Sequence, residues 1–437
     1  MLRDRCTTSR VRHFRHRLHT WPGTILSAIL CVVFILSLRA QEPVRSATAA
    51  PAIASFRRSP EAFFYLGPFQ EELRGSVNTQ YTDNVNLTAT NKISDLSFSQ
   101  ALSLNTTWVI SHLNQVTFNF GGAVIENFYG NGRNQVNFSI APNSKLEFKL
   151  AVSDYRILLF DTFSYVQNPT TNPTATNTAN LNSLSNTIGA VIDKDIGIAL
   201  LGFSADYTYN NQSGTNVAGQ ANPSTTGNRE TFRLGPRVTF RWSSSILYGF
   251  NVEATRSTGE HAASVNSLNF GPFINGKLSR DFEFDLAAGA TLIDTKPSLP
   301  PGYYYSAAIR YRINRHWQLI FTGAHDLVFT TGTSLTEENV FQIETKLDLT
   351  RLISFTASSF VNVGDDKTAI VNTGATLGRY TQFGFSAGLG WNPRKRWNTT
   401  LTYEFVRREA NSTSGTSSTG SQNYIQNTIT FQIGYAF

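Results

Sequence analysis

Residues 145–153 read Lys-Leu-Glu-Phe-Lys-Leu-Ala-Val-Ser, and this stretch decides the predicted fold. Large apolar and charged residues alternate within it. Successive side chains of a β-strand point to opposite faces, so the stretch predicts a strand with one apolar and one charged face. The apolar set is Leu146, Phe148, Leu150 and Val152, and the polar set is Lys145, Glu147, Lys149 and Ser153.

Three further stretches repeat this alternation: 232–242, 281–286 and 341–349. The segments run to about a dozen residues, which is long for a soluble strand but suits a tilted crossing of a bilayer. After residue 40 no apolar stretch approaches about 18 residues, the length that would predict a transmembrane helix.

The connections between the predicted strands alternate between short and long. Short turns on one side and long polar loops on the other are typical of an up-and-down barrel in a membrane. The predicted fold is therefore all-β: a transmembrane antiparallel up-and-down β-barrel of about 18 strands, with 16 as the alternative. The predicted short turns are 142–144, 193–195, 243–244, 279–280, 314–316, 350–351 and 392–394, and the predicted long loops are 161–185, 210–229, 257–264, 295–302, 330–338, 364–380 and 409–423.

The first 49 residues predict a secretory signal peptide. Six arginines between Arg3 and Arg17 precede an apolar run from Ile25 to Leu38, and small residues follow at 47–50. A basic region, then a short apolar region, then small residues at a cleavage site are typical of a secretory signal peptide. The predicted organisation is a signal peptide at 1–49, a periplasmic segment at 50–72 and an outer-membrane barrel at 73–437.

Removing the leader changes the apparent charge of the protein. The whole chain has 37 basic and 30 acidic residues, but residues 1–40 hold seven of the basic ones and one acid. The mature chain is therefore close to neutral and gives no support to nucleic-acid binding. Cys6 and Cys31 also lie in the leader, so the exported part can form no disulfide.

The last eleven residues form another alternating strand that closes on Phe437. Its apolar face resembles the terminal strand of bacterial outer-membrane proteins, which the barrel-assembly machinery recognises during biogenesis. The resemblance implies that machinery as a partner and makes Phe431, Ile433, Tyr435 and Phe437 the assembly signal.

Two segments carry a resemblance to a family. Residues 75–87, which contain Tyr81-Thr82-Asp83-Asn84-Val85, resemble the first strand of the beta-barrel porin 2 family, in which a Tyr/x/Asp-Asn-hydrophobic element is typical. Residues 401–408 and the strand that ends at Phe437 are similar to that family's last hairpin. The family includes porin-like proteins and barrels associated with exopolysaccharide export, so the resemblance implies the architecture more than a substrate.

In a lipid bilayer the apolar faces must point outward, so the charged faces are expected to line the barrel interior. A lumen of 16–18 strands is too wide for side chains to fill, which predicts passive diffusion of small hydrophilic solutes or ions. The charges either face one another across the lumen, creating a transverse field, or pair along neighbouring strands. The predicted pore-lining residues are Arg233, Arg237, Arg241, Arg310, Arg312, Asp281, Glu283, Asp285, Glu344, Lys346, Lys145, Glu147 and Lys149.

Other functions receive less support from the sequence. No histidine belongs to a metal or nucleophile motif, and we predict no enzyme activity and no cofactor. His325 falls on the outward set of its strand, and the pairs Asp83-Asn84 and Asp365-Asp366 are more typical of solvated loops than of calcium sites. The alternatives are a barrel accessory to exopolysaccharide export, with residues 50–72 as a docking segment or a tether, and a structural or adhesive surface protein. Each of these functions is compatible with a protein that lies in the outer-membrane lipid and forms a homo-oligomer.

Overall fold

A computed structural model describes most of the chain after residue 63. All of these residues belong to one compact unit, Ile35–Phe437. The predicted signal peptide and most of the predicted periplasmic segment lie outside the described residues. The described ranges are 64–132, 134–141, 144–167, 180–215, 221–259, 262–294, 300–329, 335–366, 379–394, 396–411 and 423–437.

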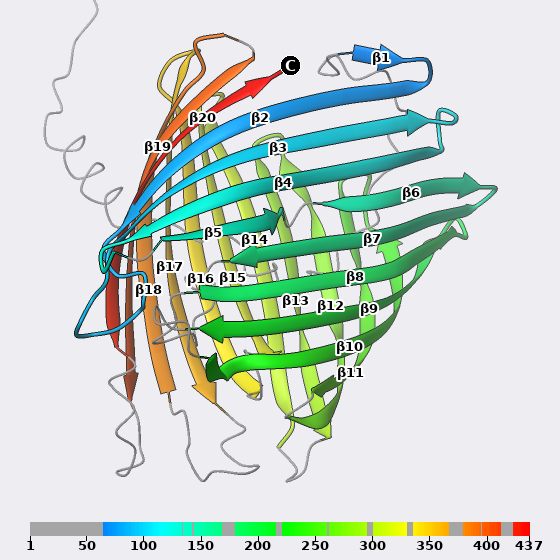
Figure 1. The fold of residues 1–437 in the computed structure, drawn as a ribbon. Helices are drawn as coiled ribbons and strands as arrows, with labels where there is room; N and C mark the ends of the chain where they lie inside the picture. The colour runs from blue at the N-terminus through cyan, green and yellow to red at the C-terminus, as the bar shows by residue number, and fades with distance from the viewer. Residues whose placement is uncertain are drawn as a thin grey trace, which may run out of the picture. The chain divides into compact units, whose positions relative to one another are not determined.

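Twenty strands within these ranges form a single antiparallel sheet (Figure 1). They are β1 (Phe64–Leu66), β2 (Phe69–Thr82), β3 (Asp95–Val109), β4 (Gln115–Tyr129), β5 (Asn134–Ile140), β6 (Lys145–Val152), β7 (Tyr155–Gln167), β8 (Asn180–Asp195), β9 (Ala199–Thr215), β10 (Ala221–Arg241), β11 (Ile246–Gly259), β12 (Ala262–Ser279), β13 (Phe282–Asp294), β14 (Gly302–Asn314), β15 (Trp317–Phe329), β16 (Leu335–Asp348), β17 (Ile353–Asp366), β18 (Arg379–Trp391), β19 (Trp397–Asn411) and β20 (Tyr424–Ala436).

The sheet closes on itself because β2 pairs with both β3 and β20. The closing register runs from Arg74 opposite Ala436 to Thr82 opposite Thr428. Strands β5 and β6 both lie between β4 and β7, so together they make one span, and β1 pairs only with β2. In the described part of the chain the barrel therefore has 18 spans, which confirms the prediction of 18 rather than 16.

The short turn predicted at 142–144 is wrong. β5 and β6 both run antiparallel to β4, so these two strands have the same direction and are not joined by a hairpin turn. The Ser144 hydroxyl accepts a hydrogen bond from the Gly121 amide at 3.0 Å, and the Phe163 amide donates to the Ser144 carbonyl at 2.9 Å. The Ser144 side chain thus replaces part of the backbone hydrogen bonding with β4 that is interrupted between β5 and β6. Sequence analysis missed two short turns, one between β3 and β4 and one between β6 and β7.

The β1 strand extends the wall at the end of the barrel that carries the short turns. Phe64 lies opposite Glu71 and Leu66 opposite Phe69, on the same side of β2 as β20. The Phe437 amide donates to the Leu73 carbonyl at 2.9 Å, so the two chain segments meet end to end along β2. The first barrel strand begins at Phe69, inside the predicted periplasmic segment.

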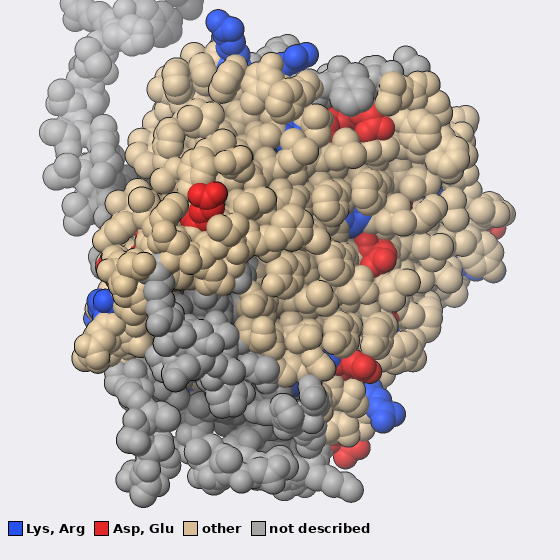
Figure 2. Space-filling view, viewed as in Figure 1, with Lys and Arg blue, Asp and Glu red and all other residues tan. Residues whose placement is uncertain are grey.

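The two faces of the wall differ in chemistry. Large apolar side chains are exposed at alternate positions of nearly every strand, such as Leu102 at 55% and Val124 at 46%. Figure 2 shows this outer face over β2 to β11, where charged residues are sparse among uncharged ones. The interior is correspondingly polar, and no helix in the described residues is long and apolar enough to cross a membrane.

Candidate functional site

The inner face of the barrel holds most of the charged residues singled out from the sequence. Along each strand the exposed apolar side chains occupy every second position and face outward. Twelve of the thirteen predicted pore-lining residues occupy the positions between them, which face inward. The other, Asp281, lies in the turn between β12 and β13. The β10 pattern illustrates the placement, because the exposed Phe232 alternates with the inward Arg233.

Several of these charges pair along the wall. The Lys145 amine lies 2.8 Å from a Glu147 carboxylate oxygen, and Lys149 lies 3.5 Å from the other oxygen of the same carboxylate. Glu283 contacts Lys277, and its other oxygen lies 3.9 Å from Arg310 on the next strand. Each of these ion pairs joins residues of the same or neighbouring strands, so they favour the second of the two arrangements considered above.

A further pair spans one intervening strand. Arg237 on β10 reaches across β9 and donates to Asp193 on β8, with 2.7 Å between Nη2 and Oδ1. Asp193 is 4% exposed and Arg237 is 15% exposed, so water screens this pair much less than a surface pair. Gly202 lies beneath the contact. Because glycine has no Cβ, the guanidinium stem can pass directly over the β9 backbone.

We expect Gly202→Ala to break this contact. An added Cβ would lie 2.6 Å from both Arg237 Cγ and Asp193 Oδ1, so the pair must move apart. The free energy of unfolding should fall by about 1–3 kcal/mol, as for other overpacked sites. Gly434→Ala is the matched control, because its Cβ would approach no atom closer than 3.8 Å. Equal stabilities of the two variants in denaturant titrations would contradict the role assigned to Gly202.

The connection between β2 and β3 packs against the inner wall. Leu87 is 1% exposed and contacts Phe360 of β17, Val406 of β19 and Tyr424 of β20. These three partners lie on the inward-facing positions of their strands, so residues 83–94, here called the inner loop, occupy part of the lumen at the long-loop end. The resemblance placed a first strand at 75–87, but β2 ends at Thr82, and nothing in the sequence pattern indicated that the following residues turn inward.

The Asp83-Asn84 pair anchors the inner loop to β20. Both carboxylate oxygens of Asp83 accept hydrogen bonds from Asn427, one from its amide at 2.7 Å and one from its side chain at 2.6 Å. The Asn84 side chain is fully buried and donates to the carbonyls of Thr88 and Ile425, each at 2.8 Å. The two residues thus act as a structural clamp, and in the described residues no group of three acidic, histidine or cysteine side chains is placed to hold a metal.

His325 lies on the outer face near the long loops, in the outward set expected for it. It is 2% exposed, and its ring stacks on Tyr303 with centroids 4.2 Å apart. One ring nitrogen lies 3.0 Å from the Asn339 side chain, and the other lies 3.1 Å from Glu337. These contacts are those of a structural residue in an aromatic girdle. His261 lies outside the described residues.

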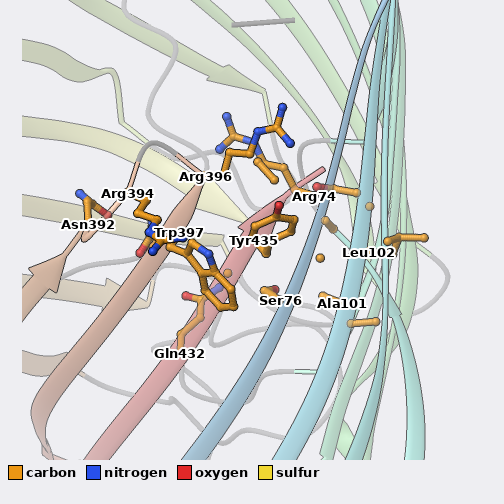
Figure 3. A pocket seen from close by; sticks show the side chains of 18 of the residues that line it. Arg74, Ser76, Ala101, Leu102, Asn392, Arg394, Arg396, Trp397, Gln432 and Tyr435 are labelled. Carbon is orange, nitrogen blue, oxygen red and sulfur yellow. The ribbon is translucent and has the colours of Figure 1, made fainter. Parts of the chain in front are cut away.

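A cavity of about 790 Å³ opens on the inner wall at the short-turn end (Figure 3). Small side chains of β2 to β5, among them Ser76, Ala101 and Ala123, form its back. Its rim carries the side chains Arg74, Arg351, Arg394 and Arg396. Sequence analysis missed these arginines because three of them lie in turns, outside the alternating strands.

The residues predicted as the assembly signal lie on the outer face of β20. Phe431, Ile433 and Phe437 are exposed at 43%, 38% and 51%. Tyr435 packs against the rings of Trp397 and Phe437, with centroids 5.0 Å and 5.1 Å away. Recognition by the assembly machinery stays a prediction.

No family model and no curated protein matches the sequence. Among solved structures, OccK7 (OpdD) of Pseudomonas aeruginosa is similar at a TM-score of 0.45 and 11% identity, over 85% of this chain and 99% of that chain. The outer membrane protein opdK of Pseudomonas aeruginosa is similar at a TM-score of 0.44 and 9% identity, over 84% of this chain and 99% of that chain. OccAB3 of Acinetobacter baumannii is similar at a TM-score of 0.43 and 10% identity, also over 84% of this chain and 99% of that chain.

Proposed function

We propose that the protein is an outer-membrane barrel through which small hydrophilic solutes diffuse passively. The observation that carries this proposal is the separation of the two faces of a closed wall. The outer face exposes large apolar side chains, as contact with lipid requires, and the inner face carries the charged residues. This separation has the opposite sense to that of a soluble β-protein, in which the interior is apolar.

The width of the barrel supports a water-filled lumen. Side chains fill the interior of an eight-stranded barrel, but barrels of 16–18 strands leave a channel unless a loop or domain plugs them. The inner loop packs on β17, β19 and β20, so it covers one sector of a wall of 18 spans. The cavity of about 790 Å³ at the other end of the lumen agrees with a path that is narrowed and still open.

Swelling of proteoliposomes tests the proposal. Vesicles that contain the refolded barrel should swell in isotonic arabinose at a rate proportional to the protein content, and slowly or not at all in a large oligosaccharide. Vesicles with heat-denatured protein are the control. Equal swelling with native and denatured protein would refute passive diffusion through the lumen.

The charges are also distributed unevenly along the barrel axis, which predicts rectification. Each span is divided at its midpoint, with β5 and β6 taken as one span. Among the described residues the short-turn half holds 17 basic and 12 acidic residues, and the long-loop half holds six basic and 12 acidic residues. Asp161 and Glu404, at the midpoints, are left out. Cations concentrate at the acidic mouth and anions at the basic mouth, so both carriers accumulate in the lumen when the long-loop side is positive.

The single-channel current should therefore be larger at that polarity in dilute salt. It should become symmetric at about 1 M salt, where the screening length is about 3 Å. The measurement uses protein added from one side of the bilayer, so that all channels insert in one orientation. A current ratio that is independent of salt would show that the fixed charges do not cause the asymmetry.

The outer face of β20 also supports a role in biogenesis. Phe431, Ile433 and Phe437 are exposed apolar residues on the strand that closes the barrel. We propose that the barrel-assembly machinery recognises this strand before it pairs with β2. Phe437→Ser should lower the yield of folded barrel in cells and leave refolding in detergent unchanged, and equal losses in both would assign Phe437 a structural role only.

A further inference from the structure

The arginine-rimmed cavity differs from the rest of the inner wall in the balance of its charges. Elsewhere on the inner wall several cations pair with acidic neighbours, as Lys145 does with Glu147. The residues that line this cavity include four arginines and no acidic residue. Glu72, which pairs with Arg74, lies outside the lining. The cavity therefore presents a net positive charge to whatever enters it.

Three different parts of the chain supply these guanidinium groups. Arg74 comes from β2, Arg351 from the turn between β16 and β17, and Arg394 and Arg396 from the turn between β18 and β19. In Figure 3 the guanidinium groups of Arg74 and Arg396 project to the same side of the cavity. Residues so far apart in sequence converge only because β20 pairs with β2 and closes the barrel.

The turns that carry these arginines are held in place. The Asn392 amide donates to the Leu352 carbonyl at 2.8 Å, which joins the two turns to each other. The Ala436 amide donates to the Arg396 carbonyl at 3.0 Å, and the Trp397 ring packs against Tyr435 with centroids 5.0 Å apart. The backbone on which the arginines stand is thus fixed before any ligand binds, which reduces the entropic cost of binding.

The remaining lining groups match a small ligand that carries oxygen atoms. Ser76, Ser103 and Ser139 offer hydroxyl groups on the back wall, and Asn398 and Gln432 offer side-chain amides. Guanidinium groups bind carboxylates and phosphates through paired N–H donors, and hydroxyl and amide groups can satisfy the other oxygens. A volume of about 790 Å³ suits a small molecule rather than a polymer.

We propose that this cavity is a binding site for small oxyanions that carry two or more negative charges. It would hold such a solute at the short-turn mouth of the lumen by paired hydrogen bonds from Arg74, Arg351, Arg394 and Arg396. The proposal rests on the proposed function, because it names the class of solute that the channel retains.

Isothermal titration calorimetry of the refolded full barrel in detergent tests the site, with pyrophosphate as the probe and dilute salt as the medium. The wild-type protein should bind pyrophosphate with one-to-one stoichiometry. The quadruple variant R74Q/R351Q/R394Q/R396Q should bind at least about tenfold more weakly, because it lacks the charge-assisted donors. Heat-modifiable migration on gels shows that each variant is folded.

A double variant, R280Q/R315Q, is the matched control. It removes two arginines from a second cavity of about 470 Å³ at the same end of the barrel, near His316 and Lys346. This variant should keep the wild-type affinity. No binding by the wild type, or equal weakening in the control, would overturn the site. Conductance of the same samples in potassium chloride is measured separately, so a failed channel and a failed binding site give different results.

Discussion

Replacement of residues 86–92 by Asn-Gly is expected to raise the unit conductance by roughly 1.5-fold or more, because the open cross-section of the pore limits the current. The inner loop occupies the lumen through Leu87, which is 1% exposed. The Val85 amide donates to the Ile93 carbonyl at 2.8 Å, so the two ends of the deletion already lie side by side. Asn-Gly is the residue pair that favours a two-residue hairpin turn.

The matched control for this deletion replaces only the tip of the inner loop. Ala89 and Thr90 are exposed, so changing both to glycine alters the loop without removing its contacts with the wall. This control should keep the wild-type conductance. If the deletion also leaves the conductance unchanged in planar bilayers, the inner loop does not narrow the conducting path.

Val124→Arg is expected to lower the free energy of unfolding in a bilayer by about 2–4 kcal/mol, the cost of a basic residue on the lipid face near the membrane midplane. Val124 lies near the centre of β4 and is 46% exposed on the outer face. The exposed Glu126 lies two residues away on the same outer face, so the cost is measured in a Glu126→Gln background, where the introduced arginine has no acidic neighbour on its own strand.

The adjacent residue gives a stringent control, because Ala123 has the same height in the barrel and faces inward, where it lines the arginine-rimmed cavity. Ala123→Arg should cost less than about 1 kcal/mol, as substitutions on a solvated surface do. Guanidinium titrations of barrels folded into phospholipid vesicles measure both values. Similar costs at the two positions would refute the assignment of the faces.

The strands and their two faces could be predicted from the sequence because a period of two is a local property. The stretch at 145–153 shows its apolar and charged faces without any knowledge of its neighbours. The count of 18 spans followed from the spacing of turns, even though one predicted turn was wrong and others were missed. Pro142-Asn143-Ser144 has the composition of a turn, but the strands on either side of it, β5 and β6, run in the same direction between β4 and β7.

The features of the site depend on contacts between distant parts of the chain, which one sequence does not reveal. The inner loop turns inward because Asp83 bonds to Asn427, 344 residues away. Arg237 was predicted to face the lumen, but its partner Asp193 lies two strands away, and Gly202 between them gave no signal. The arginine-rimmed cavity exists only after β20 has closed against β2, so its residues showed no common pattern.

The most direct test of the central claim is the single-channel conductance of the refolded mature protein in a planar bilayer, with the reversal potential under a salt gradient. An open lumen of 18 spans predicts stable steps of nanosiemens order, with a reversal potential that reports whether the arginines or the carboxylates dominate. A verified, heat-modifiable barrel that inserts and shows no conductance would contradict the claim that the lumen is open to small solutes.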